Sequence, residues 1–151
     1  MGLKDEVELL RRIPLFQRVE PAKLKLLAFA SERVTFAPQQ ELFHQGDWAD
    51  AAYIIVDGDA DVIVETPKGP LTLAKVSKND FVGEIGILCD VPRTATVKAS
   101  TPLTTLRITK DLFFNMITDF PAMGVEVMRV LAHRLEHTTS QLREALARGA
   151  H

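Results

Sequence analysis

The chain has the size and composition of one ordinary folded domain. It contains 151 residues, of which 46% are hydrophobic and 25% are charged, and its formal net charge is −2. A chain of this length can bury a substantial core, and its composition excludes an intrinsically disordered protein. Because the net charge is close to zero, the whole molecule has no general attraction to nucleic acid or anionic lipid.

Cysteine content and hydropathy indicate where the protein works. Cys89 is the one cysteine of the chain, which excludes an intrachain disulfide and is typical of a reducing compartment. No apolar run reaches the ~18 residues that a membrane helix needs. The N-terminal residues also lack the long apolar segment of a secretory signal. We therefore expect a cytoplasmic protein that does not enter a membrane.

The N-terminal 33 residues predict two short helices. Val7 and Leu10 share one helical face, and Pro14 would end that first helix. Pro21 suits the first turn of a second helix.

Residues 34–109 have the period of β-strands, because apolar side chains recur at every second position. The alternating pairs are Val34/Phe36, Tyr53/Ile55, Val62/Val64, Leu71/Leu73, Ala95/Val97 and Leu106/Ile108. Turn-forming residues separate these runs, and we expect a positive φ at Gly46 and Gly58. Several short strands without a long helix between them predict an antiparallel sandwich or barrel.

Residues 110–149 return to a helical period. A helix that begins at Lys110 should end at Pro121, and a longer one should then continue to Gly149. The longer helix carries a stripe at heptad spacing, formed by Met128, Leu131, Leu135, Thr138, Leu142 and Ala145. This stripe fits either packing of the helix on its own barrel or a dimer seam.

The segment FVGEIGILCDVPRTATV, residues 81–97, gives the strongest indication of a binding site. GEIGIL predicts one helical turn whose free N–H groups attract an anion, and Gly83 and Gly86 would let a ligand approach the backbone. Arg93 beside that turn could hold a phosphate through two parallel hydrogen bonds. Glu84 would repel a phosphate, so we interpret it as an acceptor for a sugar hydroxyl. The predicted ligand is a nucleotide with one negative charge, because a triphosphate would also require a lysine and magnesium.

The segment FVGEIGILCDVPRTATVKA resembles the phosphate-binding cassette of the cyclic nucleotide-binding domain family. The family pattern F-x-G-E-x-[GA]-x-L followed by P-R-x-A-[ST]-V is matched at Phe81, Gly83, Glu84, Gly86, Leu88, Pro92, Arg93, Ala95, Thr96 and Val97. The resemblance implies one domain that is mainly β, with an eight-stranded antiparallel jelly-roll β-barrel at 34–109 that contains the cassette 81–97. N-terminal helices at 1–33 and C-terminal helices, including a long last one, at 110–149 would flank this barrel.

The resemblance also implies roles for individual residues. Arg93 should pair with the exocyclic phosphate oxygens of cAMP or cGMP, and Glu84 should accept a hydrogen bond from the ribose 2′-hydroxyl. The rest of the cradle should come from Gly83, Ile85, Gly86, Thr94 and Ala95. Thr138 and Thr139 match positions at which the family's bacterial activators contact the adenine.

The function that this resemblance implies is regulatory. The chain would bind a cyclic nucleotide and transmit binding through its C-terminal helix, without catalytic residues, a metal or a further cofactor. A homodimer through that helix is a candidate assembly. In the family's transcriptional regulators a helix-turn-helix domain follows the corresponding helix. Since the present sequence stops at His151, we expect no direct DNA binding by this chain, whether it stands alone or is part of a longer protein.

Three alternatives remain open from the sequence. Arg93 and Glu84 could form a structural ion pair in a jelly-roll interaction or oligomerisation module that has lost nucleotide binding. His133 and His137, spaced i, i+4, could suit a metal, although a solvated helix face is favoured because no further ligand stands at suitable spacing. A metal-dependent jelly-roll enzyme is the third alternative, but its ligand residues are missing.

Overall fold

Two four-stranded antiparallel sheets form the body of the computed structural model, which describes residues 7–8, 10–13, 16 and 19–149. One sheet has the strand order β1-β8-β3-β6 and the other the order β2-β7-β4-β5. The strands are β1 (Glu32–Phe36), β2 (Glu41–Phe43), β3 (Ala51–Asp57), β4 (Ala60–Thr66), β5 (Gly69–Val76), β6 (Phe81–Val82), β7 (Thr96–Ala99) and β8 (Leu103–Thr109). These eight strands of the described residues confirm the predicted mainly β class and jelly-roll fold.

Strand β3 lies inside its sheet, between β8 and β6. This position explains why its residues form a continuous apolar run. Residues 51–56 of this strand are all buried. Ile54 and its neighbour Leu106 on β8 face a core shared with the helices. Tyr53 and Ile55 face a second core that also contains Val97 of the opposite sheet. Alternate side chains of β3 therefore point into two different cores. Burial of each large apolar side chain contributes about 1.5–3 kcal/mol to the free energy of folding.

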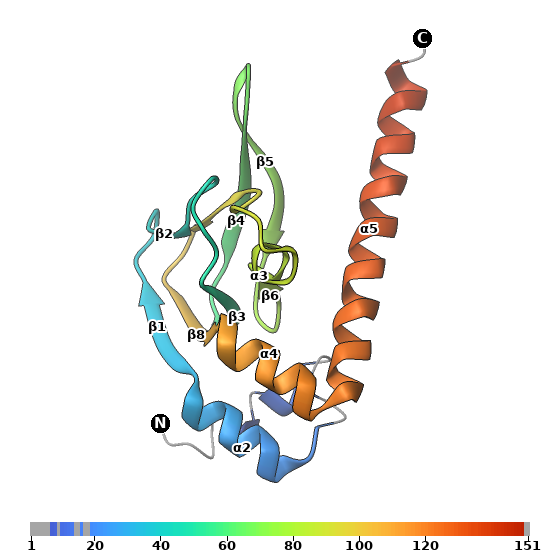
Figure 1. The fold of residues 1–151 in the computed structure, drawn as a ribbon. Helices are drawn as coiled ribbons and strands as arrows, with labels where there is room; N and C mark the ends of the chain where they lie inside the picture. The colour runs from blue at the N-terminus through green and yellow to red at the C-terminus, as the bar shows by residue number, and fades with distance from the viewer. Residues whose placement is uncertain (1–6, 9, 14–15, 17–18, 150–151) are drawn as a thin grey trace.

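Four helices of the described residues surround these sheets: α2 (Pro21–Ala30), α3 (Glu84–Cys89), α4 (Lys110–Asp119) and α5 (Pro121–Gly149). Their bounds agree with the predicted starts at Pro21 and Lys110 and with the predicted end at Gly149. Residues 7, 8, 10 and 11 are also helical, whereas the predicted end of that first helix at Pro14 lies outside the described residues. Figure 1 shows α2 and α4 near one end of the sheets, and α5 alongside the barrel on the side of α3.

The predicted positive φ angles at turns are confirmed, with +93° at Gly46 and +97° at Gly58. A Cβ atom at Gly58 would lie 2.3 Å from the carbonyl oxygen of Pro102, so this turn has room for glycine only. The turn thereby holds the start of β4 close to the start of β8.

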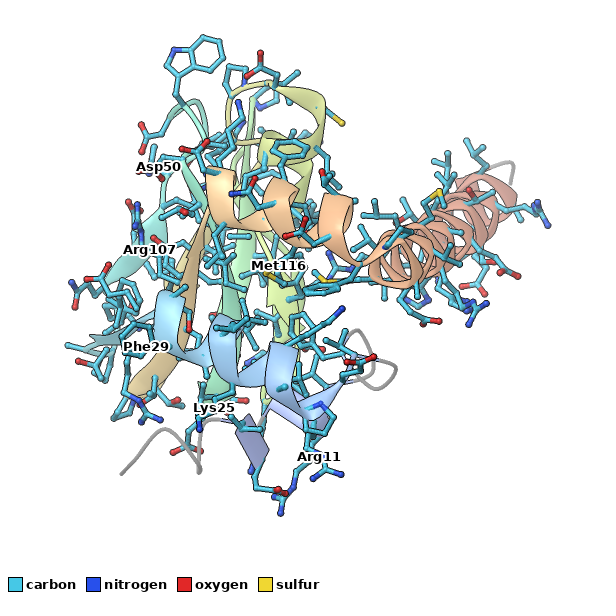
Figure 2. All side chains as sticks on the ribbon, turned by 60° about the horizontal axis from the view of Figure 1, so that its bottom comes forward. Arg11, Lys25, Phe29, Asp50, Arg107 and Met116 are labelled. Carbon is cyan, nitrogen blue, oxygen red and sulfur yellow. The ribbon has the colours of Figure 1, made fainter. Side chains whose placement is uncertain are left out.

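The apolar stripe predicted on α5 divides between two surroundings. Of the stripe, Leu131 packs against the helical core, which also contains the buried Val127 one turn earlier on α5. Met128, Leu135 and Leu142 are instead exposed, by 64%, 69% and 58%. Figure 2 shows α5 projecting from the rest of the chain with side chains around its circumference. In the described part of the chain, no helix is both long enough and apolar enough to cross a bilayer.

Candidate functional site

The cassette is shaped by two glycines that pack against protein atoms. Gly83 precedes α3 with a φ of +88°, and a Cβ there would lie 2.8 Å from Nη1 of Arg93. A Cβ on Gly86 would lie 2.6 Å from the Cβ of Ala49. Both glycines line the large cavity described below, but these contacts differ from the predicted reason for them, which was the approach of a ligand to the backbone. They allow α3 to pack closely on the arginine and on the loop before β3.

Arg93 is fixed inside the barrel by backbone atoms. Its side chain is 4% exposed, its Nη1 donates to the carbonyl oxygen of Gly83 at 2.8 Å, and its Nη2 donates to that of Ala51 at 2.5 Å. The guanidinium carbon lies 4.0 Å from the ring centroid of Phe43, a cation–π contact. The buried Nε has no hydrogen-bond partner among the described residues. A buried donor without a partner is costly, so the site favours an acceptor that reaches it.

The electrostatics around Arg93 leave a partly uncompensated positive charge. Burial lowers the pKa of the Arg93 guanidinium, and Tyr53, Asp50, Asp47 and Glu84 partly oppose this shift. At neutral pH the group is still protonated. Asp50 lies 3.9 Å from Nη2 of Arg93 but is mostly exposed and is 3.0 Å from Arg107, so it compensates the charge weakly (Figure 2). An anion would therefore be favoured here.

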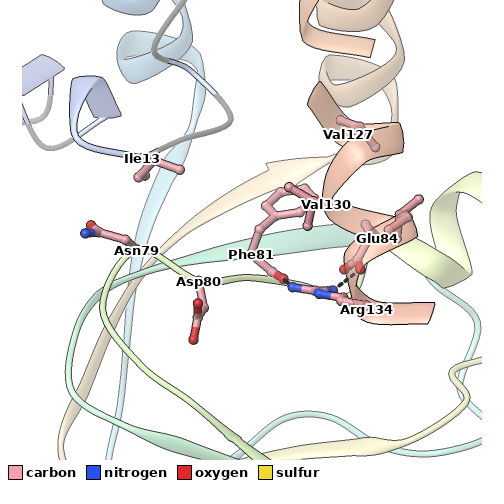
Figure 3. Close-up of a pocket in the computed structure, with 9 residues that line it drawn as sticks. Ile13, Asn79, Asp80, Phe81, Glu84, Val127, Val130 and Arg134 are labelled. Atoms are coloured by element: carbon pink, nitrogen blue, oxygen red, sulfur yellow. Dashed lines mark hydrogen bonds and ion pairs between the residues drawn. The ribbon is translucent and has the colours of Figure 1, made fainter. Parts of the chain in front are cut away.

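Glu84, on the first turn of α3, is 2% exposed and is paired with an arginine that sequence analysis missed. Nη1 of Arg134, on α5, donates to the Glu84 carboxylate, and Nη2 donates to the carbonyl oxygen of Phe81 (Figure 3). The structural ion pair considered from the sequence thus involves Arg134 in place of Arg93. A signal for Arg134 was available, because it precedes Thr138 by one helical turn and shares its face.

A cavity of about 630 Å³, here called the large cavity, opens between the cassette, strand β5 and α5. Seven predicted site residues line it: Gly83, Glu84, Gly86, Arg93, Thr94, Ala95 and Thr138. Thr139 is exposed and is not part of this lining. The backbone of Ile85 belongs to α3, while its side chain lies outside what the structure describes. The fold therefore brings the two ends of the predicted site, the cassette and the last helix, to one cavity.

A second, small cavity of about 130 Å³ lies on the other side of the Arg134–Glu84 pair (Figure 3). Asp80, Glu84 and Arg134 line both cavities. The remaining wall of the small cavity is mainly apolar and includes Val127 and Leu131 of α5. The ion pair thus stands between the large cavity, whose lining includes several charged side chains, and the apolar contact of α5 with the rest of the domain.

The histidines of α5 do not belong to a metal cluster within the described ranges. No group of three or more His, Cys, Asp or Glu side chains in that part of the chain is arranged to hold a metal ion. His133 and His137 are exposed and both line the large cavity.

Comparison with known proteins identifies the family. The family model described as "Cyclic nucleotide-binding domain" matches residues 33–120, more than half of the chain. The protein belongs to the cyclic nucleotide-binding domain family.

Particular relatives agree with this assignment. The chain is 29% identical over 140 residues to the CRP-like cAMP-activated global transcriptional regulator of Mycobacterium tuberculosis, which covers 92% of the chain and 62% of that relative. The chain thus spans about three fifths of the relative's length.

Solved structures show the same fold. The sensor domain of the transcriptional regulator DNR from Pseudomonas aeruginosa superposes with a TM-score of 0.79 at 23% identity, covering 91% of this chain and 93% of that one. The Thermus thermophilus Catabolite Activator Protein gives a TM-score of 0.78 at 24% identity, covering 85% of this chain and 61% of that one.

Proposed function

We propose that the chain is a sensor module that binds cAMP or cGMP in the large cavity and does no chemistry on it. Arg93 would donate hydrogen bonds to the cyclic phosphate, Glu84 would accept one from the ribose 2′-hydroxyl, and Thr138 would contact the base. The observation that carries the proposal is the buried Arg93 guanidinium, whose Nε lacks a partner among the described residues on the wall of a 630 Å³ cavity.

The energetics of this proposal are reasonable. Micromolar binding corresponds to about −8 kcal/mol. Hydrogen bonds to charged groups contribute about 1.5–3 kcal/mol each, and burial of the base adds to them. These contributions must exceed the cost of association and of ordering side chains. A few hydrogen bonds to Arg93 and Glu84 together with base burial meet that requirement.

Arg134 would couple ligand binding at Glu84 to the position of α5. The carboxylate proposed to bind the ribose is the one that Arg134 holds. A ribose hydroxyl on Glu84 would share or displace that contact, and so change how α5 is attached to the cassette. The signal would then be a shift in the position of α5 between two populated arrangements.

The outward face of α5 supports a homodimer. Leu135, Leu142 and Leu146 are exposed by 69%, 58% and 65%, and Met128 lies one heptad before Leu135. A second copy that packs on this face would bury these side chains in a coiled-coil-like seam. Thr139 is one turn after Leu135 and would lie at that seam. The proposed function includes no direct contact of this chain with DNA.

One observation favours a second function, a jelly-roll interaction module that binds no nucleotide. Both amino groups of Arg93 already donate to carbonyl oxygens, and Glu84 already holds Arg134. A site whose charged groups are largely satisfied by the protein can persist without a ligand.

Calorimetric titration distinguishes these two functions. The purified chain is titrated with cAMP, cGMP, 5′-AMP and adenosine under the same conditions. The sensor proposal expects micromolar, one-site binding of at least one cyclic nucleotide and weaker binding of 5′-AMP and adenosine. A chain that gives no heat with either cyclic nucleotide, although folded by circular dichroism, would support the interaction module instead.

A further inference from the structure

Two imidazole side chains of α5 line the large cavity. His133 and His137 are one helical turn apart, so they share a face of the helix with Arg134 and Thr138 between and beside them. His44 belongs to a different region, follows β2, pairs with Glu41 at 3.0 Å and does not line this cavity. His133 and His137 therefore lie at the proposed ligand site, and His44 can serve as a control because it lies elsewhere.

Charged side chains from several elements line the large cavity together with the two histidines. They are Lys75 on β5, Asp80 before β6, Glu84 on α3, Arg93 before β7, and Arg134 on α5 itself. Lys75 also lies 3.8 Å from Asp61, and Glu84 is paired with Arg134. Three permanent cations against two carboxylates leave this lining with an excess of positive charge, to which each protonated imidazole adds one unit.

We propose that His133 and His137 are specificity determinants that favour anionic over neutral ligands, increasingly so as the pH falls. This inference rests on the proposed binding of a cyclic nucleotide. Histidine changes its charge between about pH 5 and 8, whereas a cyclic phosphodiester keeps a single negative charge over that range. An anion in the cavity stabilises the protonated imidazoles, so binding should take up protons and should tighten as the pH decreases.

Neutral ligands provide the internal control for this effect. Adenosine has the base and ribose of cAMP but no phosphate, so the charge of the two imidazoles should hardly affect its binding. At separations of about 10 Å in a partly hydrated cavity, one unit charge changes the affinity for a monoanion by a few-fold. We therefore expect wild-type affinity for cAMP to be about fivefold higher near pH 6 than near pH 8, with adenosine affinity almost constant.

Titration calorimetry of the full chain near pH 6 and near pH 8 tests the proposal, using cAMP and adenosine as ligands. Near pH 6.5 each cAMP titration is repeated in two buffers with different ionisation enthalpies, because the difference in heat gives the number of protons taken up. The test variant is His133→Gln/His137→Gln, whose substitutions lie on an exposed helix face and leave the core intact. The matched control is His44→Gln.

The expected result is proton uptake on cAMP binding by the wild type and by His44→Gln, and its loss in the double variant. That variant should bind cAMP with nearly the same affinity near pH 6 as near pH 8. The same pH dependence in the wild type and in the double variant, or no proton uptake by the wild type, would overturn the inference alone. No binding of cAMP or cGMP at either pH would overturn the proposed function, and this inference with it.

Discussion

The cassette and helix α5 line the same cavity but are held in place in different ways. In the cassette, the Arg93 side chain is buried and is fixed by the carbonyl oxygens of Gly83 and Ala51. Along α5, residues 135–148 are all exposed, and hydrogen bonds to the cassette come from Arg134. One wall of the cavity is thus set by backbone geometry, whereas the other is attached by apolar contacts at the start of α5 and by the hydrogen bonds of one long side chain, Arg134.

Under the proposed function, this difference would separate recognition of the ligand from the response to it. A wall formed by buried backbone and tightly packed glycines keeps its geometry whether or not a ligand is present. A helix with few buried contacts can change position at a small cost in free energy. The cassette is therefore suited to recognise a ligand, and α5 is suited to move when the ligand arrives.

The largest expected effect comes from removing the fixed cation of the cassette. Arg93→Ala should weaken cyclic nucleotide binding by about 2–5 kcal/mol, which is roughly 30-fold or more. It should also lower the free energy of unfolding by about 1–3 kcal/mol, because two buried carbonyl oxygens lose their donor. Calorimetric titration and urea denaturation measure the two effects. Arg93→Lys is the control that keeps the charge but lacks the planar fork, and it should recover little binding.

Unaltered affinity for cAMP in folded Arg93→Ala would show that the cassette is not the recognition element.

The ion pair that joins the two regions should have the next largest effect. Arg134→Gln leaves the carboxylate of Glu84, which is 2% exposed, without its cation. We expect the free energy of unfolding to fall by about 1–3 kcal/mol, less than the loss of about 3–5 kcal/mol typical of a fully buried pair, because Arg134 itself is 40% exposed. The double variant Glu84→Gln/Arg134→Gln should recover part of this loss, as measured in a double-mutant cycle by urea denaturation.

The ligand side of the same pair can be tested with 2′-deoxy-cAMP. If Glu84 accepts a hydrogen bond from the ribose hydroxyl, Glu84→Gln should weaken cAMP binding by roughly tenfold and affect 2′-deoxy-cAMP much less. Equal losses for both ligands would mean that Glu84 acts through the position of α5 and not through the ribose.

The outward face of α5 should control association but not recognition. Leu135→Glu/Leu142→Glu places like charges on the face proposed to pair with a second copy, so light scattering should report a monomer where the wild type is a dimer. Nucleotide affinity should change by less than about threefold, because these side chains lie away from the cavity. A wild-type chain that is monomeric at all concentrations would contradict the proposed homodimer.

The smallest expected effect is a difference in cAMP affinity between variants of the two threonines of α5. Thr138 lines the large cavity and Thr139 does not. Thr138→Ala should therefore weaken cAMP binding by about 1 kcal/mol, or fivefold, the usual contribution of one hydrogen bond. Thr139→Ala, measured in the monomeric leucine variant, should bind cAMP as that variant does. The opposite order of effects would mean that α5 is rotated in the bound state.

The sequence predicted those features that depend on local patterns. The period-two runs indicated the barrel strands, and Pro21 and Lys110 indicated helix starts. The two charged residues of the cassette motif, Arg93 and Glu84, line one cavity. Helical spacing from Thr138 indicates which face of α5 carries Arg134. Its pairing with Glu84 could not be obtained in the same way, because the two residues are 50 positions apart. A contact of that kind depends on how α5 lies against the barrel, which local periodicity does not specify.

The division of the α5 stripe has a similar cause. Met128, Leu131, Leu135 and Thr138 share heptad spacing, yet their surroundings differ. Met128 and Leu135 are exposed, Leu131 packs against the helical core, and Thr138, although exposed, lines the large cavity. A helix beside a curved barrel leaves its neighbour as it extends, so residues with the same sequence pattern meet different surroundings.

The central claim is that the buried Arg93 and Glu84 receive a cyclic nucleotide. A crystal structure of the chain grown with saturating cAMP tests it most directly. We predict electron density for one nucleotide in the large cavity, with its phosphate oxygens within hydrogen-bonding distance of the Arg93 guanidinium and its ribose 2′-hydroxyl on Glu84. A nucleotide bound elsewhere, or an empty cavity with Arg93 still held by the carbonyl oxygens of Gly83 and Ala51, would contradict the claim.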